Sequence, residues 1–268
     1  MVKMRFSLQT LLLIAAIGCP MSSLSQENGT AAGTPAAPTS AVAIAPEAMV
    51  ALEEMGKYLR GLKAFTVTST TLTDEVVSDG VKLQFGGTAS LKVRRPDRLQ
   101  AEIASDRKQR KIYYDGRNLT LYGPRVKYYA TVPAPPTLRE TVEVLAKKYG
   151  VAMPLVDLFY WGTEAAPVED IKFAAYIGPA TVDGVMTDQY VFRQEGIDWQ
   201  IWIQQGVTPV PRKLVITTTS EPTHPEYIAT MRWNVTPKLE NASFAFKPPA
   251  GAMRIPLQTA EGKVETAQ

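Results

Sequence analysis

The sequence contains very few of the side chains that most often perform catalysis or bind metals. Its 268 residues include one cysteine, Cys19, and one histidine, His224. His224 lies in the loop SEPTHPEY between two prolines, without an adjacent partner from a catalytic motif. The nucleophile elbow, the phosphate-binding glycine loop, the dinucleotide fingerprint and the HExxH zinc motif are all missing. We therefore expect no catalytic residue, no metal site and no cofactor.

Long apolar segments are scarce as well. The run from Leu11 to Gly18 is much shorter than the roughly 20 residues that cross a bilayer. Lys3 and Arg5 precede this run and small residues follow it, which is the layout of a secretory signal peptide. The sequence thus predicts an exported protein without a transmembrane segment.

The signal can be processed in two ways. Ser23 and Ser25 fit the small-x-small pattern ahead of a cleavage site, which favours a signal peptide over residues 1–25 and release before Gln26. Alternatively, Cys19 ends the run as AAIGC, which resembles a bacterial lipobox, and lipidation there would anchor the protein to a membrane. In both cases the exported domain has no cysteine and therefore no disulfide.

Positive and negative charges are nearly balanced. The chain has 29 basic and 26 acidic residues, and removing Lys3 and Arg5 with the signal leaves 27 basic residues. This balance does not favour nucleic-acid binding, which depends on neutralising phosphates. Basic residues gather in SLKVRRPDR and SDRKQRK, where we expect a strand edge and a hairpin end exposed to water. Their alternative role is contact with an anionic membrane surface or an acidic partner.

Composition divides the exported chain into three parts. Residues 26–45 are rich in Ala, Pro and Thr and have too little large apolar surface to fold, so we expect a linker. Residues 46–257 have the size of one β-rich domain. Residues 258–268 are expected to form a polar tail.

Three segments of the domain carry helical signals. Residues 46–60 repeat apolar side chains every three or four positions, which is typical of an amphipathic helix. TLRETVEVLAKKYG begins with a capping box, Thr137 and Glu140, and ends at Gly150. PLVDLFYWG follows, with Pro154 suited to a first helical turn, and it is too apolar to stand in water. All three segments must therefore lie on another element.

The other segments of the domain alternate apolar and polar residues, as strands with one apolar face do. Ten or eleven such segments are separated by turn residues such as Asp115-Gly116. A single sheet of that many strands curls, and the helical segments can cover its concave side. We therefore predict an α+β, mainly β fold, an incomplete antiparallel barrel whose concave face is covered by helices.

The same alternation predicts which side chains face the concavity. In IDWQIWIQQ, Trp199 points inward, as core packing or as a cavity wall, whereas Trp202 points to the polar face, as a cross-strand packing residue or as part of a docking surface. Applied to the other strands, strand parity gives candidate ligand-binding walls at Leu83, Phe85, Leu91, Val93, Leu99, Ile103, Leu119, Leu121, Trp199, Ile201, Leu214 and Ile216.

Several stretches resemble an uncharacterised periplasmic family catalogued as domain of unknown function 2092 (DUF2092). They are RRPDRL, YYDGRNLTLYGPRVKYYATVPAP, VAMPLVDLFYW, VDGVMTDQYVFRQEGIDWQIWIQQGVTPVPRKLVIT and FAFKPPAGAMRIP. The family is similar in fold to the LolA and LolB lipoprotein carriers and to the amino-terminal domain of the regulator RseB. The resemblance implies a periplasmic protein with an eleven-stranded half-barrel and a helical lid. Gln189 stands where relatives often have histidine, so a role that depends on that histidine is not expected here.

Two hypotheses for the function remain open at this point. In the first, the protein is not an enzyme, and its concave cavity binds a lipid or a lipoprotein acyl chain under a lid of residues 46–60 and 137–162. In the second, the protein is an envelope interaction or stress-sensing module with a filled half-barrel, which docks a protein partner through its outer face. The sequence does not decide whether the cavity is open or filled.

Overall fold

The computed structural model describes most of the predicted domain. The described residues are 44–151, 153, 155–161, 163, 166, 168–261 and 264–265. The expected signal peptide, its alternative lipidation site Cys19 and Pro154 lie outside this part of the chain. Within the described residues, no helix combines the length and the apolar character needed to cross a membrane.

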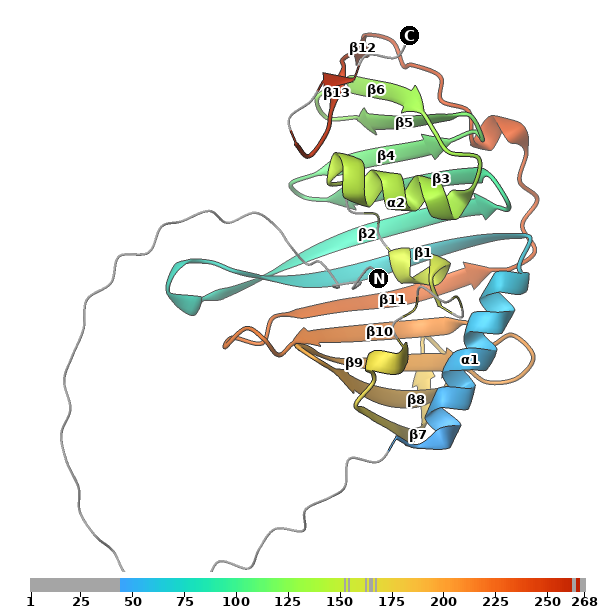
Figure 1. The fold of residues 1–268 in the computed structure, drawn as a ribbon, viewed down its shortest axis with the longest axis vertical. Coiled ribbons are helices and arrows are strands. Elements are labelled where there is room, and N and C mark those ends of the chain that lie inside the picture. Colours follow the sequence, from blue (N-terminus) through green and yellow to red (C-terminus); the bar gives the residue numbers. More distant parts are fainter. Residues whose placement is uncertain are drawn as a thin grey trace, which may run out of the picture.

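A single twelve-stranded sheet forms the body of the protein (Figure 1). Its spatial order is β12-β6-β5-β4-β3-β2-β1-β11-β10-β9-β8-β7, and it stays open between the two outermost strands. The strands are β1 (Ala64–Val76), β2 (Lys82–Arg94), β3 (Arg98–Ser105), β4 (Gln109–Tyr114), β5 (Asn118–Gly123), β6 (Tyr128–Pro133), β7 (Phe173–Val182), β8 (Val185–Gln194), β9 (Ile197–Gln204), β10 (Pro211–Thr218), β11 (Glu226–Asn234) and β12 (Met253–Arg254). The predicted incomplete antiparallel barrel is confirmed, with the two-residue β12 added in parallel to β6.

The sheet consists of two meanders that meet at its centre. Strands β1 to β6 follow one another in space, as do β7 to β11. The junction is the antiparallel pair of β1 and β11, in which Thr66 lies opposite Asn234 and Thr73 lies opposite Tyr227. Residues separated by more than 150 positions in the sequence are thus hydrogen-bonded neighbours in the middle of the sheet.

Helical segments cover the concave face, as expected. Helix α1 (Pro46–Gly61) lies over the meander β7 to β11, and α2 (Leu138–Tyr149) lies over β3 and β4 (Figure 1). Between them the predicted third helix is reduced to one 3-10 turn, η2 (Val156–Phe159). Three further 3-10 turns are η1 (Ser78–Gly80), η3 (Val168–Asp170) and η4 (Asn241–Ser243).

The predicted capping signals of α2 are confirmed. The hydroxyl of Thr137 accepts a hydrogen bond from the backbone N–H of Glu140 at 3.3 Å and donates one to the Glu140 carboxylate at 2.7 Å. At the other end Gly150 adopts φ 62° and donates its N–H to the carbonyl of Leu145. Glycine reaches this left-handed conformation without a steric penalty, which explains why the helix ends there.

The chain after β11 forms a strap around the outside of the sheet. We call residues 235–261 the C-terminal strap. It passes through η4, pairs with β6 as β12, and continues into β13 (Leu257–Gln258), which pairs with β14 (Val264–Glu265). Ala260 donates its backbone N–H to the carbonyl of Lys148 at 2.8 Å, at the end of α2. The packed chain therefore extends past residue 257, where the sequence predicted the start of a polar tail.

Polar and aromatic contacts attach this strap to the outer face. The guanidinium of Arg94 donates to the carbonyl of Leu239 at 3.0 Å and to the side chain of Asn241, and it lies 5.3 Å from the ring centroid of Phe244. The ring of Phe246 packs against tyrosines of β4, β5 and β6, namely Tyr113, Tyr122 and Tyr129. Part of the tyrosine-rich meander thus contacts the chain's own C-terminal segment.

Candidate functional site

The concave face is the candidate site, because strands of both meanders turn their apolar side chains toward it. Most of the predicted wall residues lie in one continuous hydrophobic core there. The buried ones are Leu91, Val93, Leu99, Leu119, Trp199, Ile201, Leu214 and Ile216. Leu121 is partly buried against the same core, and Ile103 is partly buried.

Three predicted wall residues, Leu83, Phe85 and Ile103, lie outside this core, and the placement of Leu83 and Phe85 corrects the sequence prediction. Strand β2 pairs with β3 only from Gly87 onward, so the preceding part of β2 projects past β3 and is paired with β1 alone (Figure 1). Leu83 in this part of β2 is 40% exposed. Phe85 is partly buried, because the guanidinium of Arg107 lies 3.9 Å from its ring centroid. Strand parity predicted the side of the sheet, but no wall of the concavity extends that far.

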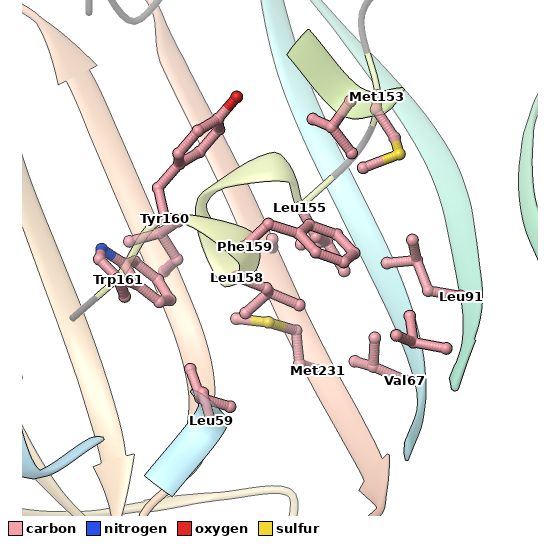
Figure 2. Packing of buried hydrophobic residues seen from close by; sticks show 14 of the residues in the cluster. Leu59, Val67, Leu91, Met153, Leu155, Leu158, Phe159, Tyr160, Trp161 and Met231 are labelled. Atoms are coloured by element: carbon pink, nitrogen blue, oxygen red, sulfur yellow. The ribbon is translucent and has the colours of Figure 1, made fainter. Parts of the chain in front are cut away.

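A compact apolar segment fills the centre of the concavity. We call residues 155–161 the plug; it contains η2 and follows α2 in the sequence. Figure 2 shows the plug packed against side chains of the sheet and of α1, among them Val67, Leu91, Met231 and Leu59. Its buried side chains are Leu155, Leu158, Phe159, Tyr160 and Trp161. The plug therefore occupies the space in which a ligand of the concave face would lie.

Trp199 belongs to the part of the wall that β9 forms, third from the β7 edge of the sheet. Its ring stacks on Phe192 with a centroid distance of 4.1 Å and an interplanar angle of 14°. Its indole N–H donates a buried hydrogen bond of 2.9 Å to the side-chain oxygen of Gln194. Because both its ring and its N–H have partners, Trp199 is held in a fixed position and forms a rigid part of the wall.

A small cavity remains between the plug and Trp199. Its volume is about 10 Å³, which is about the space that a single water molecule requires. Its lining comes from the plug and from β9 and β10, through Asp157, Trp161, Ile197, Trp199, Leu214 and Ile216. Beside Trp199 the plug thus leaves little free space.

Asp157 is a partly buried acid of the plug that the sequence analysis did not identify. Its Oδ1 atom is shielded from solvent and has no hydrogen-bond partner in the described part of the chain. Burial raises the pKa of the Asp157 carboxyl from 3.8 to about 6. Burial also raises the pKa of Tyr227, and the nearby Asp157 charge adds to that increase. The signal in the sequence was the single carboxylate within the apolar run PLVDLFYWG.

Trp202 lies on the outer face, as strand parity predicted, but it does not stand open to water. It is 9% exposed and packs with Val182 and Val215 in a second, smaller core. In this core the end of the β7–β8 hairpin lies against the outer face of the sheet. The pairing of β7 with β8 also shifts register between Tyr176 and Gly178. The ammonium of Lys213 lies 4.6 Å from the ring centroid of Trp202. A ring covered in this way offers a partner little surface.

His224 is exposed in the β10–β11 loop, where its backbone carbonyl lies 3.5 Å from the Lys82 ammonium. Among the described residues, no group of three or more His, Cys, Asp and Glu side chains is placed to hold a metal ion.

Comparison with known proteins identifies one matching family. The family described as predicted periplasmic protein (DUF2092) matches residues 48–258, which is nearly the whole domain expected from the sequence. The sequence matches none of the curated proteins with which it was compared.

Several solved structures have a similar chain path and little sequence in common with this protein. Lipoprotein LppX from Mycobacterium tuberculosis is 14% identical, with 73% of this chain and 99% of that chain covered and a TM-score of 0.45. LprF from Mycobacterium bovis is 13% identical, with 78% and 99% covered and a TM-score of 0.45. A LolA superfamily protein from Nitrosomonas europaea is 11% identical, with 74% and 97% covered and a TM-score of 0.31.

Proposed function

This chain belongs to the DUF2092 family of predicted periplasmic proteins, and on that premise we propose that it is a non-catalytic carrier of acyl chains. Its concave face binds the acyl chain of a lipid or lipoprotein when the plug moves away from the wall. Binding depends on apolar burial, and release depends on return of the plug. The protein partner, where there is one, is the lipoprotein that carries the chain.

The observation that best supports this proposal is the contrast between the wall and the plug. The wall is a continuous hydrogen-bonded sheet, whereas the plug has a single 3-10 turn as its regular structure. Leu155, at the start of that turn, has a left-handed backbone with φ 53°, and Asp157 within it has an unpartnered buried oxygen. Each feature costs the closed state on the order of 1–3 kcal/mol. Displacing the plug removes both costs.

An acyl chain and the plug have comparable affinities for the same wall. Burying one methylene group is worth about 0.8 kcal/mol, and burying a large apolar side chain is worth about 1.5–3 kcal/mol. Exchange of the five buried side chains of the plug for an acyl chain of about 14 methylene groups is therefore nearly balanced in free energy. Such a balance allows both loading and release.

The first experiment is to purify the protein from a bacterial periplasm without detergent. Native mass spectrometry of the intact protein and analysis of its organic extract then report any bound molecule. We expect a lipid or lipopeptide in stoichiometric amount. A protein that is empty, and that also takes up neither fatty acids nor phospholipids, would overturn the proposal.

Variants on the two faces of β9 test the site itself. Trp199→Glu places a charge on the wall, and we expect it to abolish uptake of a fluorescent fatty acid. Trp202→Phe changes the same strand on its outer face and serves as the matched control, with uptake unchanged. Circular dichroism and thermal unfolding show whether each variant is folded. Equal, undiminished uptake by both folded variants would exclude Trp199 as a wall residue.

One observation favours a second candidate function. The cavity beside Trp199 has a volume of only about 10 Å³, and the plug packs against the wall there. A permanently filled half-barrel fits an envelope interaction or stress-sensing module that binds a protein partner on its outer face. Hydrogen exchange in the plug separates the two candidates, because fatty acid accelerates exchange there only if the plug is displaced.

A further inference from the structure

A polar groove lies on the outer face of the sheet, opposite the plug. It has a volume of about 360 Å³ and is formed by β11, β1, β2 and β3 together with the turn between β7 and β8. That volume lies within the range of about 300–1,000 Å³ found for small-molecule sites. The groove is separate from the concave face, and its function does not depend on the proposed carrier function.

The register of four strands explains the polar character of this groove. In one row across the sheet, Thr230, Thr70 and Thr88 lie side by side on β11, β1 and β2. In the next row, Thr68 and Ser90 lie side by side on β1 and β2. All five residues line the groove, so its floor is a grid of hydroxyl groups.

These hydroxyl groups are available to a ligand. Within the described residues, none of the five forms a side-chain hydrogen bond with another side chain, in contrast to Thr120 and Thr131, whose hydroxyl groups bond each other at 2.9 Å. Thr68, Thr70 and Thr88 are also exposed to solvent. Each hydroxyl can donate one hydrogen bond and accept others.

Compensated charges border the hydroxyl grid. At the β11 side, the guanidinium of Arg232 pairs with the carboxylate of Asp183 at 2.9 Å. At the β3 side, the Glu102 carboxylate pairs with the Lys111 ammonium at 3.1 Å and accepts a hydrogen bond from Gln109 at 3.0 Å. Because each charge has an opposite neighbour, the groove has no net charge that would attract a small anion or cation.

Arg232 and Glu102 stand at the two ends of the same row as Thr68 and Ser90. With strands spaced about 4.8 Å apart, this row spans about 14 Å. It is therefore long enough to contact more than one unit of an extended polar ligand. The β-branched threonines also carry methyl groups, so the lining residues offer apolar as well as polar atoms.

We propose that the groove formed by Thr68, Thr70, Thr88, Ser90 and Thr230 binds a saccharide. A saccharide carries neutral hydroxyl groups that both donate and accept hydrogen bonds, and C–H groups that contact methyls. It thus matches a grid of uncharged hydroxyl groups. An ionic ligand would need an unpaired charge as its partner, whereas the charged groups that border this grid are already paired with each other. An elongated oligosaccharide fits the row between Arg232 and Glu102 better than a single sugar does.

The test uses the full exported protein and three defined probes: maltotetraose, cellotetraose and the tetramer of N-acetylglucosamine. Binding is measured by calorimetry and by chemical-shift changes of the threonine methyl groups. Thr70→Val and Thr88→Val remove a hydroxyl and keep the β-branched shape. Thr66→Val is the matched control, because Thr66 lies on the outer face of β1 but does not line the groove.

We expect at least one probe to bind, with methyl shifts confined to the groove. Loss of one hydrogen bond should weaken binding about three- to tenfold in Thr70→Val and in Thr88→Val. Thr66→Val should bind as the wild type does. If none of the three probes binds, or if Thr66→Val weakens binding as much as Thr70→Val does, the assignment of this groove is wrong. The lipid content of the protein is unaffected in every case, which separates this result from a test of the concave face.

Discussion

The ring of Phe246 lies 5.0 Å, centroid to centroid, from the ring of Tyr129, at an interplanar angle of 49°. Tyr113 and Tyr122 approach the same phenylalanine at 5.3 and 5.4 Å. The three tyrosines come from three adjacent strands, and Phe246 comes from the C-terminal strap. Tilted aromatic pairs at these distances stabilise beyond the area that they bury.

Phe246→Ala should therefore release the strap from the outer face. We expect the free energy of unfolding to fall by about 1–3 kcal/mol, since Phe246 is partly buried. Urea unfolding measures this change, and limited proteolysis reports faster cleavage after residue 234. Tyr128→Ala, at a 39% exposed side chain of β6, serves as the control. If the control loses as much stability as Phe246→Ala does, the aromatic cluster does not hold the strap.

Asp157 should make stability depend on pH. Its pKa is about 6 in the folded protein, against an ordinary value of 3.8. The folded state thus binds the proton more tightly than the unfolded state does, and stability falls as pH rises from about 4 to about 6. Ionisation of the Asp157 carboxyl lowers the free energy of unfolding by about 3 kcal/mol in total. About 2 kcal/mol of this decrease falls between pH 4.5 and 7.5.

Asp157→Asn should remove this pH dependence, because an amide does not ionise. Urea unfolding at pH 4.5 and 7.5 gives the difference for each protein. Glu169→Gln, at an exposed acid of η3, should keep the wild-type difference. An unchanged difference in Asp157→Asn would mean that the carboxyl is solvated rather than buried in the plug.

Thr137→Ala should destabilise α2 through its first turn. The variant loses the hydrogen bond that the hydroxyl accepts from Glu140 and the one that it donates to the carboxylate. We expect the free energy of unfolding of Thr137→Ala to fall by about 0.5–2 kcal/mol. Thr137→Ser should keep most of the wild-type stability, because serine is an equally good N-cap residue. Thermal unfolding distinguishes the two. Equal melting temperatures for the alanine and serine variants would show that the cap contributes nothing.

Trp202→Ala should lower stability without affecting ligand uptake. The ring fills the small core with Val182 and Val215 on the outer face, so its removal leaves a void. We expect the free energy of unfolding to fall by about 2–4 kcal/mol. This decrease is smaller than that of the largest truncations in a main core, because the core around Trp202 is small. Unfolding by urea and uptake of a fluorescent fatty acid are measured on the same sample. A large change in uptake at unchanged stability would reassign Trp202 to the ligand site.

Much of the fold could be predicted because it depends on local patterns. Alternation within single strands placed Leu91, Trp199 and Ile216 on the inner face, and a capping box with a terminal glycine predicted the ends of α2. These signals act within a few residues. Predictions from them are correct wherever the rest of the chain packs around the segment as expected.

The failures share one physical cause, which is packing between segments that are distant in the sequence. Strand parity gave the side on which Leu83 lies, but not that β2 extends past β3 there. Parity also placed Trp202 on the outer face, with cross-strand packing as one of two interpretations, but it did not indicate that Val182 at the end of the β7–β8 hairpin packs on the ring. The strap over Phe246 and the filling of the half-barrel by the plug have the same origin.

The pairing of β1 with β11 has a consequence for how an exported chain folds. Strands β1 to β6 can pair in order as they emerge from the membrane, because each lies next to its successor. The second edge of β1 finds its partner only when residues 226–234 have also crossed. Until then β1 presents an unpaired edge, which is the kind of surface on which strands of other chains add. The time between the exit of β1 and the exit of β11 is therefore the interval in which this protein most needs protection from aggregation during translocation.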